Sequence, residues 1–230
     1  LCENQSQIYI YDTIKKTGII LLRPSTFLDF RSYITPFRLM LSWMANHFGG
    51  EIIHAAGICL NKKAILINGQ KGSGKSTLAL LSVKEGFQIL SDDALLIVED
   101  TAYSIYSRAK LEIDNVFTQE LISQSFALAG NPTAKRILPL SGFGPNFLHN
   151  SRIGFVVLPV RNNVSKLERL DLRSSQSMFI DNSLREIFNG TFVNRIRHLN
   201  ILKSFPAFKL YAGVDMRQNL NLLKGLIHLK

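Results

Sequence analysis

The chain has 230 residues, of which 46% are hydrophobic and 19% are charged, and its formal net charge is +10 at pH 7. This composition excludes a largely disordered protein, because the chain carries enough apolar surface to bury a sizeable core. The length fits one large domain, and we predict a single domain over residues 1–230, in which residues 1–50 form an N-terminal extension packed on the remainder.

The positive charge favours acidic partners, such as nucleotides or acidic peptides. The basic residues are scattered and form no long tract, so we expect no nucleic-acid partner. Because no apolar run reaches about 18 residues, we also expect no membrane-spanning helix. Cys2 and Cys59 lack the paired spacing of a disulfide framework or a zinc site, which is typical of a cytoplasmic protein with reduced thiols.

The first fifty residues predict an antiparallel pair of strands followed by a helix. Residues 8–11 and 18–22 are short apolar runs bounded by turn residues. Thr35 and Pro36 predict the start of the helix, as its N-cap and its first residue, and Gly49-Gly50 ends it. An apolar stripe at helical spacing predicts packing against the core; it consists of Phe37, Met40, Leu41, Met44 and Phe48.

One motif organises the chain, and it lies between an expected buried strand at residues 64–68 and an expected helix at residues 78–83. The motif fits G-x-x-x-x-G-K-[ST], the pattern of a phosphate-binding P-loop, in the strand–loop–helix context that the pattern requires. The loop that we expect to bind a nucleotide consists of Gly69, Gln70, Lys71, Gly72, Ser73, Gly74, Lys75, Ser76 and Thr77.

Each part of this loop has a physical task. The glycines let the backbone turn tightly around an anion, where a Cβ atom would clash. The exposed N–H groups and the helix N-terminus present partial positive charge to phosphate oxygens. Lys75 adds a full charge at the transferred phosphoryl group, and the Ser76 hydroxyl is expected to ligate Mg²⁺.

Two further groups flank the loop along the chain. Residues 51–60 predict a strand that carries His54 and leads, through a hairpin turn at residues 61–63, into the strand before the loop. On spacing alone, His54 is more often a core residue than a catalytic one. After the loop helix, which we expect to end at Gly86, residues 87–90 predict a short strand that delivers Asp92 and Asp93 at its C-terminal end. A P-loop enzyme places its metal-organising acid there, although an Asx-type turn is the alternative.

The second half of the chain predicts a run of alternating elements with no further chemical motif. Residues 102–113, 152–158, 167–170 and 204–211 are typical of strands, with another strand after residue 94. Residues 115–129, 174–189 and 193–204 are typical of helices, and Asp215 is expected to cap a last helix. Residues 133–150 predict a long loop around a short strand at 136–138; Lys135 and Arg136 there could face a phosphate, or could be solvated surface charge.

The segment from about Ile52 to Val98 resembles the catalytic domain of HPr kinase/phosphorylase and its diverged relatives. Three features carry the resemblance in one frame: His54 followed by Ala55-Ala-Gly57, the P-loop, and the Asp92-Asp93 pair. The resemblance implies an α/β fold, that of a P-loop kinase of the phosphoenolpyruvate-carboxykinase-like type, with a bent mixed sheet and flanking helices.

The resemblance also implies an activity and its site. A Mg²⁺-dependent enzyme of this family transfers a phosphoryl group from a nucleotide, ATP or GTP, to a serine hydroxyl. By position, Asp93 resembles the acid/base that takes the hydroxyl proton, Asp92 lies beside it at the metal site, and His54 helps to hold the cluster. The catalytic residues implied are thus Asp93, Asp92, His54 and Lys75, and the metal ligands implied are Ser76, Asp92 and Asp93. A homo-oligomer is compatible with the family.

The sequence departs from the family after the aspartates. The family carries Leu-Glu-Ile-Arg-Gly-Leu-Gly there, whereas Leu111-Glu-Ile113 is followed by Asp114-Asn-Val and lies closer to Asp93. Glu112 is therefore a weak candidate for a metal ligand. The family's downstream arginine has no clear counterpart, and Lys135, Arg136 and Arg161 are candidates. The protein HPr is accordingly not implied as the acceptor, and a peptide or small metabolite stays open.

Two other functions remain open at this point. A regulatory module could bind a nucleotide without turnover, although the intact aspartate pair argues for chemistry. A mechanical ATPase is less favoured, because no Leu-Ser-Gly-Gly-Gln-type motif and no second nucleotide-binding motif is present. In each case the nucleotide is the expected partner.

Overall fold

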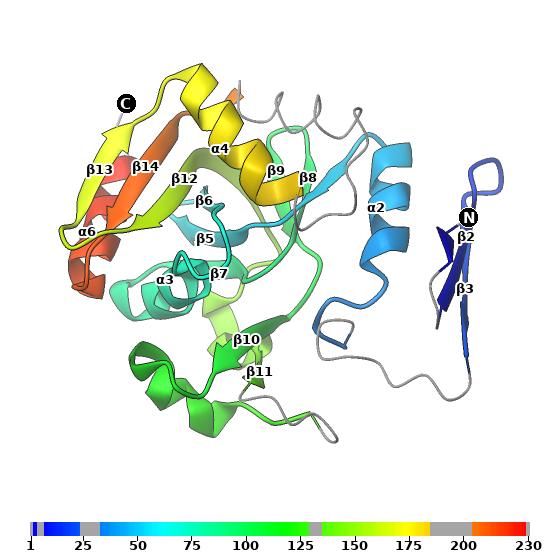
Figure 1. Cartoon of the computed structure of the whole chain (residues 1–230), viewed down its shortest axis with the longest axis horizontal. Helices are drawn as coiled ribbons and strands as arrows, with labels where there is room; N and C mark the ends of the chain where they lie inside the picture. Colours follow the sequence, from blue (N-terminus) through cyan, green and yellow to red (C-terminus); the bar gives the residue numbers. More distant parts are fainter. Residues whose placement is uncertain (1, 4–6, 24–32, 129–134, 185–203, 229–230) are drawn as a thin grey trace.

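The computed structural model describes residues 2–3, 7–23, 33–128, 135–184 and 204–228. These residues form a mixed α/β fold, in which a nine-stranded sheet is accompanied by a three-stranded and a two-stranded sheet (Figure 1). The three-stranded sheet consists of β1 (Cys2–Glu3), β2 (Gln7–Asp12) and β3 (Thr17–Leu22). The two-stranded sheet pairs β10 (Arg108–Glu112) with β11 (Lys135–Pro139).

The main sheet has the strand order β4-β8-β9-β12-β6-β5-β7, and β14 pairs with β12 and β13. The longest strand, β12, runs parallel to β6 and β14, whereas the other pairs are antiparallel. The mixed sheet is therefore confirmed, and the phosphoenolpyruvate-carboxykinase-like type stays a prediction. Its strands are β4 (Glu51–Ile53), β5 (Ala56–Leu60), β6 (Lys63–Ile67), β7 (Gln88–Ser91), β8 (Leu95–Val98), β9 (Thr101–Ser104), β12 (Asn150–Arg161), β13 (Lys166–Arg169) and β14 (Ala207–Ala212).

Helices cover both faces of this sheet. Apolar side chains of α3 (Lys75–Ser82) and α6 (Met216–Ile227) join one buried cluster, and Phe179 of α4 (Leu172–Leu184) joins the cluster on the other face. Strand β6 contributes alternate residues to the two clusters, which explains why residues 64–67 form a continuous apolar run. The remaining helical elements are α2 (Arg38–His47), η1 (Val83–Glu85), η2 (Val116–Gln124) and η3 (Leu140–Asn146).

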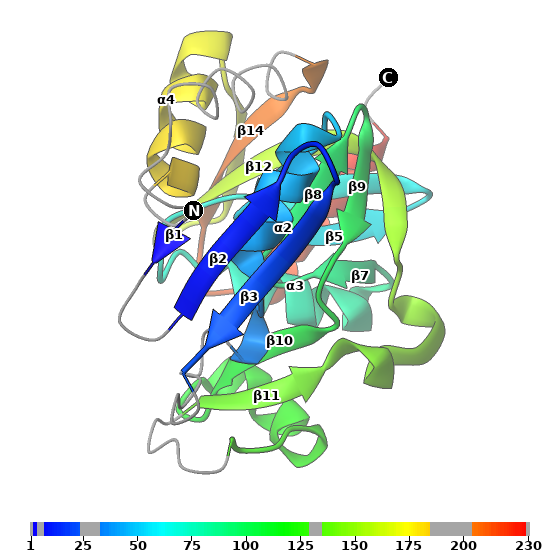
Figure 2. The same cartoon turned by 90° about the vertical axis from the view of Figure 1, so that its right-hand side faces the viewer.

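The N-terminal hairpin lies against α2, which separates it from the main sheet (Figures 1 and 2). Residues of β2 and β3 pair in antiparallel register, as predicted, and α2 contacts both β2 and β4. At the contact, a Cβ atom on Gly18 would lie 2.6 Å from Met40 Sδ, so only glycine fits without displacing that side chain. The prediction of a single domain with a packed extension is not tested by this contact alone.

Helix α2 begins later than predicted. Thr35 and Pro36 lie before it, the residue at its N-cap is Phe37 with φ 59°, and the first helical residue is Arg38. The Pro36 carbonyl, which an earlier start would use inside the helix, instead accepts a hydrogen bond from the Tyr106 hydroxyl at 3.0 Å. Tertiary contacts thus override the local start signal.

The strand predicted over residues 51–60 is broken in two. Strand β4 pairs with β8, whereas β5 pairs with β6 and β7, and His54 and Ala55 form the break. The His54 carbonyl is satisfied there by the Asn68 side-chain amide at 2.9 Å. This side-chain partner replaces a ladder bond and lets the chain cross between two parts of the sheet.

Three other expectations need smaller corrections. Residues 102–113 form two strands, β9 and β10, in different sheets, and the element at 116–124 is a 3-10 rather than an α-helix. Residues 140–146 of the expected loop are helical as well. The helix expected at 193–204 lies outside the described residues, apart from Ser204. By contrast, Asp215 caps α6 as predicted, since its side chain accepts hydrogen bonds from two backbone N–H groups.

Among the described residues, no helix has both the length and the apolar character needed to cross a membrane.

Candidate active site

The glycine-rich loop joins β6 to α3, as the sequence predicts, and its backbone explains its glycines. Gly72 has φ 82° and Gly74, the N-cap of α3, has φ 93°, a region that side-chain-bearing residues rarely adopt. A Cβ atom on Gly69 would lie 2.6 Å from Ser73 Oγ and 3.3 Å from Pro159. The first glycine therefore allows close packing against β12, and the other two allow the turn into the helix.

Two polar side chains of the loop, those of Lys75 and Thr77, form hydrogen bonds. The Lys75 ammonium is buried and donates to the carbonyl oxygens of Gly69 and Gln70, the second at 3.1 Å. Thr77 Oγ1 accepts a hydrogen bond from Asn115 Nδ2 at 2.9 Å, which ties the first turn of α3 to the segment after β10. Gln70, Lys71 and Gly72 are exposed, so the loop is open to solvent on this side.

The two aspartates follow β7 at the turn into β8. The Ser91 hydroxyl donates to the Ala94 carbonyl at 2.8 Å and closes that turn around them. Asp92 and Asp93 are only 2% and 4% exposed. A plain Asx-type turn on a protein surface does not bury two adjacent carboxylates, so this turn is organised by contacts from elsewhere in the fold.

Asp92 faces the first turn of the P-loop helix. Its Oδ2 accepts a hydrogen bond from the Lys110 backbone N–H at 3.0 Å, and its Oδ1 has no hydrogen-bond partner among the described residues. Burial raises the pKa of Asp92, while the nearby Ser76 hydroxyl and the Lys110 ammonium lower it by less. The buried oxygen without a partner marks a place where a cation would stabilise the carboxylate.

Asp93 is surrounded by basic side chains. Its Oδ1 lies 3.0 Å from Lys110 Nζ and 3.4 Å from His54 Nδ1, and its Oδ2 lies 3.4 Å from Arg38 Nη1. Burial raises the pKa of Asp93, but the attraction of Lys110, His54 and Arg38 outweighs it and holds the pKa well below the usual value. The environments of the two neighbouring carboxylates thus push their pKa values in opposite directions.

The structure places His54 beside Asp93 and the Ser76 hydroxyl beside Asp92. Lys75 precedes Ser76 at the start of α3, and the roles predicted for these residues stay predictions. The structure adds two residues that sequence reasoning missed, Arg38 and Lys110. Lys110 was visible as an alternating charge within a predicted strand, but nothing in the sequence indicates that β10 crosses the aspartate turn. Arg38 lies at the start of α2, where the sequence shows an apolar stripe but no signal of a contact with the aspartates.

The other candidate residues lie apart from this cluster. Glu112 is exposed at the end of β10, opposite Lys135 in the β10–β11 pair. Arg136 donates hydrogen bonds to the Ser125 hydroxyl and carbonyl, at 2.7 and 2.6 Å, so its guanidinium helps to hold β11 on η2. Arg161 is exposed at the C-terminal end of β12.

The donor set at the loop fits Mg²⁺. The ion prefers oxygen ligands and usually keeps several waters while it binds one or two protein groups and substrate phosphates. The Ser76 hydroxyl and the buried carboxylate of Asp92, whose Oδ1 has no hydrogen-bond partner in the described part of the chain, provide such oxygens close together. Among the described residues, no group of three or more His, Cys, Asp or Glu side chains could hold a metal ion.

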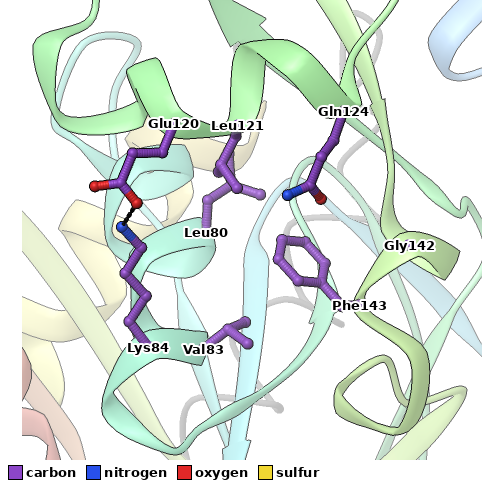
Figure 3. A pocket seen from close by; sticks show the side chains of 8 residues that line it. All are labelled: Leu80, Val83, Lys84, Glu120, Leu121, Gln124, Gly142 and Phe143. Atoms are coloured by element: carbon purple, nitrogen blue, oxygen red, sulfur yellow. Dashed lines mark hydrogen bonds and ion pairs between the residues drawn. The ribbon is translucent and has the colours of Figure 1, made fainter.

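A pocket of about 390 Å³ lies elsewhere, beside the C-terminal half of α3 (Figure 3). Its polar rim includes the ion pair between Lys84 and Glu120, and Phe143 and Leu121 face its interior. None of the aspartates or P-loop residues lines it. The lining residues are Leu80, Val83, Lys84, Glu120, Leu121, Gln124, Gly142 and Phe143.

Comparison with known proteins gives a distant structural similarity. No family model matches the chain, and no curated protein matches it. Among solved structures, the HPr(Ser) kinase/phosphatase from Coxiella burnetii is similar with a TM-score of 0.40 and 15% sequence identity, over 77% of this chain and 88% of that one. A TM-score this low supports no conclusion on fold or function, so membership of that family stays a prediction and the site stands on its own geometry.

Proposed function

We propose that this chain is a Mg²⁺-dependent phosphotransferase that moves the γ-phosphoryl group of ATP or GTP to a serine-type hydroxyl of a protein, a peptide or a small molecule. One observation carries the proposal: the Ser76 hydroxyl, in the first turn of the P-loop helix, lies beside the buried carboxylate of Asp92. An anion-binding loop and an acidic pair at the same edge of a sheet are the two parts that phosphoryl transfer requires.

The loop residues bind and orient the nucleotide in this proposal. Backbone N–H groups of residues 69–77 and the N-terminus of α3 face the phosphates. The Lys75 ammonium, held by the Gly69 and Gln70 carbonyls, exchanges these neutral oxygens for charged phosphate oxygens. The exchange is favourable because a hydrogen bond to an ionised acceptor is stronger than one to a carbonyl.

The Ser76 hydroxyl and Asp92 would hold the magnesium ion. When bound, the ion neutralises charge that develops on the phosphate oxygens. Asp92 suits this task because its burial disfavours an isolated carboxylate, so a nearby divalent cation relieves the cost of ionising it.

Asp93 orients the acceptor hydroxyl in this proposal and accepts its proton late. The basic side chains around it lower its pKa, which keeps it ionised, as a proton acceptor must be, and reduces its basicity. A loose transition state tolerates a weak base, because the attacking oxygen gains little bonding before the phosphoryl group leaves. Positioning of the hydroxyl then contributes more than proton abstraction.

The test is direct. Calorimetric titration with Mg-ATP and Mg-GTP measures binding, and incubation with γ-labelled nucleotide and cell extract, followed by identification of the labelled species, measures transfer. We expect binding by the wild type and a labelled hydroxyl-bearing product; in Lys75→Ala, at unchanged folding, binding should weaken and the product should be lost. Absence of nucleotide binding by the folded wild type contradicts the proposal.

A second candidate is a nucleotide-binding regulatory module without turnover. It is favoured by the same ion pairs, since a carboxylate held by Lys110, His54 and Arg38 is a weak base. Binding of Mg-nucleotide with no labelled product from any extract fraction, and no slow hydrolysis, would support this module instead of the kinase.

A further inference from the structure

Arg38 reaches the aspartate pair from outside the P-loop sheet. It is the first residue of α2, its side chain is 6% exposed, and its Nη1 lies 3.4 Å from Asp93 Oδ2. The other two basic groups, Lys110 Nζ and His54 Nδ1, lie against the opposite oxygen, Oδ1. The carboxylate is thereby held at both of its oxygens, which fixes its rotation about the Cβ–Cγ bond.

The segment before Arg38 is fastened to the site by separate contacts. The Tyr106 hydroxyl donates to the Pro36 carbonyl at 3.0 Å, and Arg108 Nη1 donates to the Tyr33 carbonyl at 2.8 Å. The Arg108 guanidinium also lies over the Tyr33 ring, 4.6 Å from its centroid. These contacts hold the segment at residues 33–36 against residues 106–108, at the start of β10.

The backbone carries an unfavourable conformation at this point. Phe37 has φ 59°, in the left-handed region, which costs a residue with a side chain about 1–2 kcal/mol. Strain of this kind persists only where surrounding contacts determine it, and it is concentrated at functional sites. Here it turns the chain so that the next side chain, that of Arg38, faces Asp93.

The need to neutralise the Asp93 carboxylate does not explain why Arg38 is buried beside it. Lys110 already supplies a full charge at 3.0 Å, and removing a second cation from water costs several kcal/mol. A buried ion pair is therefore weak evidence for a stabilising role and better evidence for a geometric one. A planar guanidinium is suited to that role, because its donors are fixed in one plane.

We propose that Arg38 is a positioning residue of the phosphotransfer site, which holds Asp93 in the direction needed to meet the acceptor hydroxyl. This inference rests on the proposed function. It also makes the N-terminal segment at residues 33–38 part of the active site rather than an appendage to the catalytic sheet.

The test separates turnover from nucleotide binding. Arg38→Met removes the charge and the planar donors and keeps an unbranched side chain; Arg38→Lys keeps the charge. We expect Arg38→Met to lower kcat at least 100-fold with nucleotide affinity within threefold of wild type, and Arg38→Lys to recover at least tenfold of that loss. A kcat within threefold of wild type in Arg38→Met overturns the proposal, and so does an equal fall in affinity and kcat.

Two control variants define what else could lower the rate. Arg152→Met removes an exposed arginine, paired with Asp100, and should leave kcat within twofold. Arg108→Leu loosens the segment that carries Arg38 without removing its charge, and should lower kcat at most about tenfold. If Arg108→Leu matches Arg38→Met, the segment acts only as a structural fastening and the positioning role is wrong.

A readout without turnover keeps this inference separate from the proposed function. If the wild type binds nucleotide but transfers no phosphoryl group, the kinase proposal fails, and a double-mutant cycle of Arg38→Met and Asp93→Asn on the unfolding equilibrium decides the pairing. We expect a coupling of at least tenfold in the unfolding constant, about 1.4 kcal/mol. A coupling below threefold shows that Arg38 does not hold Asp93, whatever the activity of the chain.

Discussion

The P-loop and the cluster around Asp93 lie side by side but are built in different ways. The loop consists of nine successive residues whose conformation follows from its own glycines and from the helix it begins. The cluster takes Arg38 from α2, His54 from the break between β4 and β5, and Lys110 from β10. One half of the site is therefore local in the sequence, and the other exists only when distant segments meet.

This difference predicts which changes act on binding alone and which act on the fold. A substitution in the local loop should weaken ligand binding but change the free energy of unfolding little. A substitution in the cluster of buried charges should lower the free energy of unfolding, because it leaves charged side chains from several elements without a partner. The following predictions test that contrast, from the largest effect to the smallest.

Lys75→Ala changes the loop at residues 69–77 and should have the largest effect on activity of all the variants. Loss of the ammonium at the transferred phosphoryl group should lower turnover by about 10³-fold or more and weaken nucleotide binding. Thermal unfolding of the unliganded variant should change by only a few degrees, because the Lys75 ammonium donates to two carbonyl oxygens of its own loop. Unfolding of the variant at room temperature would contradict this.

Asp93→Ala should disrupt the cluster around Asp93 and lower the free energy of unfolding. It leaves the buried Arg38 and the partly buried Lys110 without their shared carboxylate, which costs about 3–5 kcal/mol when a buried pair is broken on one side. Denaturant unfolding measures the loss. Glu120→Ala, which breaks the exposed pair with Lys84, is the matched control and should cost at most about 1 kcal/mol.

The same variant should change the acid dependence of stability. The pKa of Asp93 is lowered in the folded state from an ordinary value of 3.8, so its contribution is present above about pH 4 and is lost as the pH falls toward the folded-state value. The difference in unfolding free energy between wild type and Asp93→Ala should therefore shrink below pH 4. A difference that stays constant down to pH 2 would contradict the ion pairs.

Gly74→Ala tests whether the backbone conformation of the loop requires glycine at the N-cap of α3. The residue has φ 93°, so an added side chain strains the entry to α3 and should cost about 1–2 kcal/mol. Because no heavy atom lies within 4 Å of the added Cβ atom, the cost comes from the backbone alone. Gly142→Ala is the control: its added Cβ atom also lies in open space and its φ is not in the left-handed region, so it should cost less than Gly74→Ala. Denaturant midpoints of the two variants measure the difference.

Tyr106→Phe tests the fastening of the N-terminal segment and should have the smallest effect. Loss of one hydrogen bond to the Pro36 carbonyl should cost about 1 kcal/mol. Burial also raises the pKa of Tyr106 to about 12, so its stabilising contribution is present below pH 10 and is lost as the pH rises toward 12. Ultraviolet titration should show one late-ionising tyrosine in the wild type that is missing from the variant.

The local half of the site was predictable from the sequence. The glycine-rich turn into α3 and the short strand β7 before the aspartates follow from signals within a few residues, as does the Asp215 cap of α6 elsewhere in the fold. Arg38 and Lys110 were not predictable as site residues, because their roles depend on where α2 and β10 pack. The break at His54 was not predicted for the same reason: an apolar run indicates that a strand is buried but does not show which strand it pairs with.

The placement of β12 has a consequence for how the protein is made. This strand, at Asn150–Arg161, lies directly beside the P-loop strand, which comes almost ninety residues earlier, and beside β14, which comes more than forty residues later. A nascent chain that ends before β12 has no neighbour for one side of β6, so the glycine-rich loop that follows β6 lacks half of its support. Chaperone engagement and protease sensitivity of ribosome-bound intermediates should therefore drop abruptly once β12 emerges, and again once β14 does.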